Sequence, residues 1–81
     1  MKVRVLKVTD TNEKSKYERI WNSTRMLPFL EIGAPMYLEY ADDPNLVRTT
    51  SQVIGFQENL DEKIKTIHTL NSIYTLEVLE E

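Results

Sequence analysis

Short segments with a strand-like spacing of apolar residues, separated by turn residues, constrain this chain most. In residues 36–40 (MYLEY), Met36, Leu38 and Tyr40 alternate with the two residues between them. Such strict alternation places the two sets of side chains on opposite faces of a strand. β-branched and aromatic residues in similar patterns predict further strands at residues 2–8, 46–58, 63–70 and 73–79.

Turn chemistry predicts how these strands connect. Gly55 lies inside the longest segment and indicates a bend or bulge of the kind that closes small barrels. Asn71 and Ser72 predict a hairpin turn between the last two strands. The stretch ADDPN (residues 41–45) predicts a loop, because Pro44 fixes its own backbone and restricts that of its predecessor.

Residues 16–27 fit two structures. As a strand, Tyr17, Arg19 and Trp21 alternate with their neighbours, and the segment pairs back on the first strand. As a helix, Tyr17, Ile20 and Trp21 share one face. We favour the strand, because aromatic and β-branched residues are frequent here and a proline soon follows.

The whole chain is predicted to form one domain, residues 1–81, because 81 residues leave no room for a second core. The predicted fold is mainly β: a small SH3-like barrel of five or six short antiparallel strands, with one short helix near residues 16–27 as the alternative. A core this thin argues against a large active-site cleft.

The composition excludes several kinds of chemistry. The chain has no cysteine, two glycines and one histidine, so thiolate chemistry, zinc–thiolate sites and glycine-rich phosphate loops are all excluded. His68 lies four residues before Ser72, across a hairpin end, but no acidic residue nearby would orient it as a base. We therefore predict no catalytic residue, no metal and no cofactor, and a protein that is not an enzyme. Without a signal peptide, cysteines or a membrane-spanning segment, we expect a cytoplasmic location.

Charge is distributed unevenly along the chain. Residues 1–30 carry seven basic and three acidic residues, whereas residues 31–81 carry three basic and ten acidic ones. A basic third can contact phosphate, and the candidate nucleic-acid-binding residues are Lys2, Arg4, Arg19 and Arg25. The acidic isoelectric point, near 5.1, argues against this function.

The C-terminal 45 or so residues resemble a known pattern. Thr-Thr-Ser-Gln-Val at residues 49–53 and Thr-Leu-Asn-Ser-Ile-Tyr-Thr-Leu at residues 69–76 are similar to motifs of small uncharacterised proteins from Gram-positive bacteria, their phages and integrative elements. The resemblance implies a compact SH3-like barrel without an assigned activity. It therefore carries no functional residues to this chain.

The sequence favours a non-catalytic interaction module that binds an unidentified protein partner, in association with a mobile element. The candidate partner-binding residues are Tyr17, Trp21 and Tyr37, because exposed aromatic residues often form interaction hot spots. A nucleic-acid-binding barrel is the alternative. We favour a monomer over a homodimer, because terminal strands of opposite charge can pair within one chain and so avoid the entropy cost of association.

Overall fold

The chain forms a closed barrel, and the computed structural model describes its residues 1–42 and 46–81. In this part of the chain the elements are, in order, β1 (Lys2–Thr9), the 3-10 turn η1 (Glu18–Ile20), β2 (Thr24–Met26), β3 (Pro35–Tyr40), β4 (Val47–Asn59), β5 (Ile64–Thr69) and β6 (Ile73–Glu80). Each strand pairs antiparallel with the next, and β6 pairs with β1, so the sheet closes on itself. The predicted mainly-β barrel of five or six antiparallel strands is confirmed.

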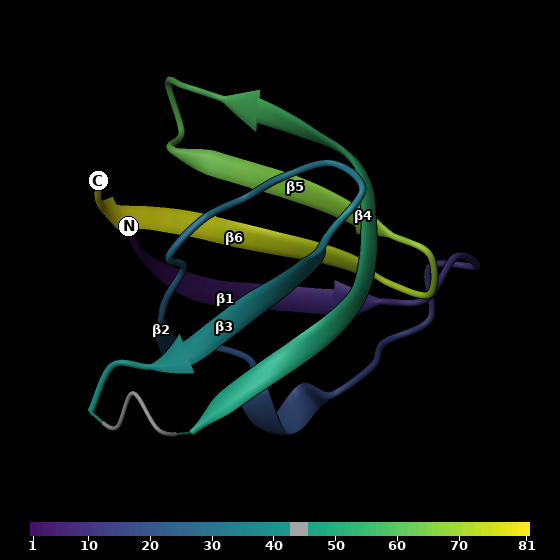
Figure 1. Ribbon diagram of the computed structural model, residues 1–81, viewed down its shortest axis with the longest axis horizontal. Coiled ribbons are helices and arrows are strands. Elements are labelled where there is room, and N and C mark those ends of the chain that lie inside the picture. Colours follow the sequence, from purple (N-terminus) through teal and green to yellow (C-terminus); the bar gives the residue numbers. More distant parts are fainter. Residues whose placement is uncertain (43–45) are drawn as a thin grey trace.

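The long strand β4 takes part in both halves of the barrel. Its first part pairs with β3, where Leu38 lies opposite Arg48, and its second part pairs with β5, where Phe56 lies opposite Ile67. Figure 1 shows β4 curving from its place beside β3 to its place beside β5. The register shifts just before Gly55, so the predicted bend at this glycine is confirmed.

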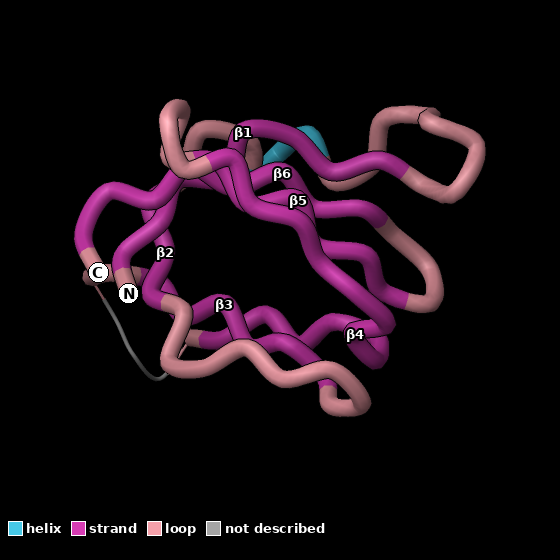
Figure 2. Tube along the Cα trace, turned by 90° about the horizontal axis from the view of Figure 1, so that it is seen from above, coloured by secondary structure: helices cyan, strands magenta, loops and turns pink. Residues whose placement is uncertain are grey.

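The core consists of inward-pointing side chains from β1, β3, β4, β5 and β6, from η1, and from Leu27 directly after β2. Alternation supplies them, since every second residue of a strand faces the same side. Figure 2 shows the strands wrapped around this interior. The buried apolar residues are Val3, Val5, Val8, Ile20, Leu27, Met36, Leu38, Val53, Ile67, Tyr74 and Leu76. Removing them from water is the main force that holds so small a barrel together.

The two terminal strands lie side by side within one chain. Lys2 of β1 is opposite Glu80 of β6, and the Arg4 guanidinium lies 3.3 Å from a Glu77 carboxylate oxygen on the outer face. The N- and C-termini are accordingly close together in both views (Figures 1 and 2). The sequence predicted that the oppositely charged terminal strands can pair within one chain, and β1 and β6 do so. Their opposite charges therefore support closure of the sheet.

The favoured strand over residues 16–27 is wrong for the first part of that segment. Tyr17 and Asn22 have φ angles of 53° and 65°, in the left-handed region, which an extended strand does not contain. Between them lies the single turn η1, so the alternative of a short helix is confirmed in this reduced form. A strand forms only later, where β2 pairs with β1 and places Thr24 opposite Arg4.

The predicted hairpin between β5 and β6 is confirmed. The Thr69 N–H donates to the Ser72 carbonyl oxygen at 2.8 Å, and the Thr69 hydroxyl donates to the same oxygen at 2.9 Å. The Ser72 hydroxyl accepts a hydrogen bond from Lys16 Nζ at 2.9 Å, and His68 lies opposite Ile73 in the ladder. In the predicted loop at residues 41–45, the residues Asp43, Pro44 and Asn45 lie outside the described part of the chain.

Candidate functional site

A pocket rich in arginine lies where β2, β3, β4 and η1 meet. We call it the arginine pocket; its volume is about 340 Å³, and it is lined by Arg19, Ile20, Arg25, Tyr40, Val47, Arg48 and Thr49. No acidic residue from residues 1–42 or 46–81 lines it. Three guanidinium groups without an acidic neighbour in the lining make the pocket attractive to anions.

Arg25 occupies a position that the fold directs into the barrel. In β2 it lies opposite Val3 of β1, whose side chain is fully buried, and opposite Tyr40 of β3. Arg25 itself is only 1% exposed. Arginine is rarely buried to this extent unless a partner accepts its N–H groups.

The guanidinium of Arg25 is held in place but not fully hydrogen-bonded. Its central carbon lies 3.6 Å from the centroid of the Tyr40 ring, and its Nε donates to the Ser23 hydroxyl at 3.1 Å. Its Nη1 is buried and has no hydrogen-bond partner among the described residues. A buried donor without an acceptor costs about 1–3 kcal/mol, and more when it is charged.

Arg48 repeats this arrangement from another strand. It lies opposite Leu38, and its guanidinium carbon is 3.7 Å from the centroid of the Tyr17 ring. Its Nε is also buried without a partner in the described part of the chain. Lys16 Nζ lies 5.0 Å from the same ring centroid, so two cations contact Tyr17.

Tyr17 reaches this position through an unusual backbone. Its φ of 53° places it in the left-handed region immediately before η1, and no side-chain hydrogen bond caps the turn. This conformation costs a residue other than glycine roughly 1–2 kcal/mol. Strained residues are frequent at binding sites, and this one stacks on Arg48, which lines the pocket.

The four candidate nucleic-acid-binding residues do not gather in one place. Arg19 and Arg25 share the arginine pocket, Arg19 from η1 and Arg25 from β2. Arg4 projects from the outer face of β1 toward Glu77, and Lys2 lies at the strand end opposite Met26 and Glu80.

The three candidate partner-binding aromatics are also separate. Tyr17 is 36% exposed and stacks with Arg48 at the arginine pocket. Trp21 is half-buried against the core, and its Nε1 donates to the Lys16 carbonyl oxygen at 3.0 Å. Tyr37 lies opposite Thr49 and packs against Phe29, with 5.8 Å between the ring centroids.

Sequence reasoning missed Arg48 and Tyr40 as site residues. A signal was present for Tyr40, because alternation in residues 36–40 places it on the same face as the core residues Met36 and Leu38. For Arg48, the signal is a charged residue at a core-facing position, and recognising that position requires the register with β3. An arginine on the core face of a strand is unusual enough to mark a candidate site.

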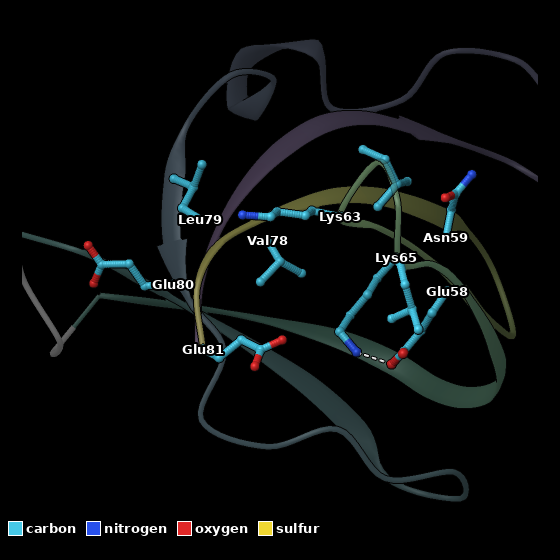
Figure 3. A pocket seen from close by; sticks show the side chains of 10 residues that line it. Glu58, Asn59, Lys63, Lys65, Val78, Leu79, Glu80 and Glu81 are labelled. Carbon is cyan, nitrogen blue, oxygen red and sulfur yellow. Dashed lines mark hydrogen bonds and ion pairs between the residues drawn. The ribbon is translucent and has the colours of Figure 1, made fainter.

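A second hollow lies between the β4–β5 turn and the end of β6, as Figure 3 shows. Its volume is about 250 Å³, and it holds charges of both signs, including Lys63 and Glu81. Lys65 forms an ion pair with Glu58 there (Figure 3). Because the charges offset one another and the buried unpaired donors lie elsewhere, the arginine pocket is the stronger candidate.

Comparison of the chain with models of protein families, with curated proteins and with solved structures finds no match. The SH3-like classification therefore rests on the sequence resemblance and stays a prediction. Within the described residues, no helix has the length and apolar character needed to cross a membrane. The same residues contain no cluster of three or more histidine, aspartate or glutamate side chains arranged to hold a metal ion.

Proposed function

We propose that this protein is a non-catalytic interaction module that binds an acidic segment of a partner protein in the arginine pocket. The observation that carries the proposal is Arg25, a 1% exposed arginine whose Nη1 has no acceptor among the described residues. A ligand oxygen at this position would complete the hydrogen bonding of the buried guanidinium. Binding would thereby recover free energy that the free protein forgoes.

The arrangement of the pocket supports recognition rather than chemistry. Its described lining offers arginines, a tyrosine, a threonine and apolar residues, but no carboxylate or histidine to act as a general base. Arginine and tyrosine are the residue types enriched at the centres of protein interfaces, where both lose little freedom on binding. Stacking of Arg25 and Arg48 on tyrosine rings further orders the donors before a ligand arrives.

The test is a titration of the protein with a glutamate-rich peptide, measured by calorimetry at low salt. We expect saturable binding that Arg48→Gln weakens at least about tenfold, since a hydrogen bond to a charged group contributes about 1.5–3 kcal/mol. Arg4→Gln is the matched control, because it removes the same charge from the outer face. If both variants weaken binding equally, or if the protein binds no acidic peptide, the proposal is wrong.

Nucleic-acid binding through Lys2, Arg4, Arg19 and Arg25 is the second candidate. Its supporting observation is that Arg19 and Arg25 line one pocket beside Tyr40, a combination suited to phosphate contacts and base stacking. Titration with single- and double-stranded DNA and RNA at low salt tests it. Binding that falls steeply with added salt would support this function, and no detectable binding would exclude it.

A further inference from the structure

We infer that the arginine pocket is a phosphate site, and that its ligand is the phosphorylated side chain of a partner protein. This inference rests on the proposed function and names the chemical group that the partner presents. Three observations support it. The two unpaired donors belong to different guanidinium groups, three arginines line the pocket, and the chain as a whole carries a net negative charge.

The unpaired donors belong to two different guanidinium groups. Arg25 comes from β2 and Arg48 from β4, and β3 lies between these two strands. Each guanidinium is stacked on its own tyrosine, at 3.6 Å and 3.7 Å, so its plane is fixed and its N–H groups are directed along that plane.

This placement favours a tetrahedral ligand over a planar one. A carboxylate has two oxygens in one plane and pairs best with a single guanidinium fork. Bound in that way to Arg25, it would leave the buried Nε of Arg48 unpaired. A phosphate monoester presents three acceptor oxygens in different directions, which suits a pocket lined by more than one arginine.

The charge in the pocket points the same way. Arg19, Arg25 and Arg48 all line it, no acidic residue among the described ones does, and Lys16 lies close to Tyr17 at its edge. A single carboxylate offsets one of these charges. A phosphate monoester carries about −1.5 to −2 at pH 7 and offsets more of them.

The surroundings favour one phosphate group over a nucleic-acid backbone. The chain has a net charge of −3. Of the two candidate cations outside the pocket, Arg4 is paired with Glu77 on the outer face, and Lys2 lies at the end of β1 opposite Glu80. A nucleic acid needs a run of cations that follows its successive phosphates. In the described part of the chain, three arginines instead line one pocket, an arrangement typical of sites that recognise a single phosphorylated side chain.

The experiment is an NMR titration at constant ionic strength that follows the Nε–H signal of Arg48. The probes are inorganic phosphate, a short glycine–alanine peptide with one phosphoserine, and the same peptide with glutamate at that position. We expect phosphate and the phosphopeptide to shift the signal, and the phosphopeptide to bind at least about tenfold more tightly than the glutamate peptide. Arg25→Gln and Arg48→Gln should each reduce this binding, whereas Arg4→Gln should leave it unchanged.

The pH dependence gives a second readout. Affinity for phosphate should rise between pH 5 and pH 7.5, because the second pKa of a phosphate monoester is about 6. The described lining of the pocket contains no histidine and no carboxylate, the side-chain types whose reference pKa values lie nearest this range. Affinity for the glutamate peptide should stay level, since its carboxylate is already ionised.

Each outcome separates the inference from the function on which it rests. Equal binding of the phosphoserine and glutamate peptides would overturn the phosphate site but leave an acidic-partner module standing. A signal that responds to inorganic phosphate but not to the phosphopeptide would show that the ligand is free phosphate. Tighter binding of single-stranded DNA or RNA than of the phosphopeptide would support the nucleic-acid function instead. If no acidic, phosphorylated or nucleic-acid probe binds, both proposals fail. Should Arg25→Gln not fold, Arg48→Gln provides the same test.

Discussion

Replacing Arg25 with methionine tests whether the buried guanidinium serves the fold or a ligand. The change removes the hydrogen bond to Ser23 and the stacking on Tyr40, which contribute about 1.5–3 and 0.5–2 kcal/mol. It also removes two destabilising contributions. An unpaired buried donor costs about 1–3 kcal/mol, and a desolvated charge costs several kcal/mol. Because these contributions nearly cancel, we expect the free energy of unfolding of Arg25→Met to lie within about 1 kcal/mol of that of the natural protein, or above it.

Urea unfolding followed by Trp21 fluorescence measures this difference. Leu27→Ala is the control, since Leu27 is a fully apolar core residue on the same segment and its truncation should lower the free energy of unfolding by about 2–5 kcal/mol. If Arg25→Met lowers the free energy of unfolding as much as Leu27→Ala does, the guanidinium stabilises the barrel and the argument for a ligand-binding role is refuted. A variant that is stable but no longer binds anions would show that the charge is kept for binding.

Three other predictions follow from the structure. The free energy of unfolding of Tyr17→Gly should be about 1 kcal/mol higher than that of Tyr17→Ala, because glycine adopts a φ of 53° without strain. Equal free energies of unfolding in urea would contradict this. The backbone N–H of Lys14 donates to Asp10 and lowers the pKa of that carboxyl, so Asp10→Ala should reduce thermal stability at pH 7. This difference in thermal stability should vanish as the pH falls through the lowered pKa of Asp10, which lies below the usual 3.8. A difference that does not change with pH would contradict the prediction. Sedimentation at micromolar concentration should give a mass near 9.5 kDa, because β1 and β6 pair within one chain; a doubled mass would refute the predicted monomer.

The sequence alone predicted most of the barrel, because strand alternation and turn chemistry are local properties. Residues 36–40 become β3, with Met36 and Leu38 buried as predicted, and the hairpin turn falls at Asn71 and Ser72. Gly55 marked the bulge in β4, since a missing side chain at that point weakens regular pairing. Each of these signals lies within a few residues of the feature it predicts.

Two short elements could not be predicted in this way. The strand β2 has three residues and η1 has three, so neither is long enough to show a period of its own. β2 exists because β1 and β3 offer it hydrogen-bond partners on both sides. The left-handed backbone of Tyr17, whose ring lies 3.7 Å from the Arg48 guanidinium carbon, also has no signature in the local sequence pattern.

The arginine pocket belongs entirely to the tertiary structure. The sequence predicted Arg25 as a candidate nucleic-acid-binding residue together with Lys2, Arg4 and Arg19, and it gave no role to Arg48. Closure of the sheet turns Arg4 to the outer face and directs Arg25 and Arg48 to the inner one. Local sequence determines which residues alternate, but only the register between strands decides which distant side chains share a face, because that register depends on pairing across the whole barrel.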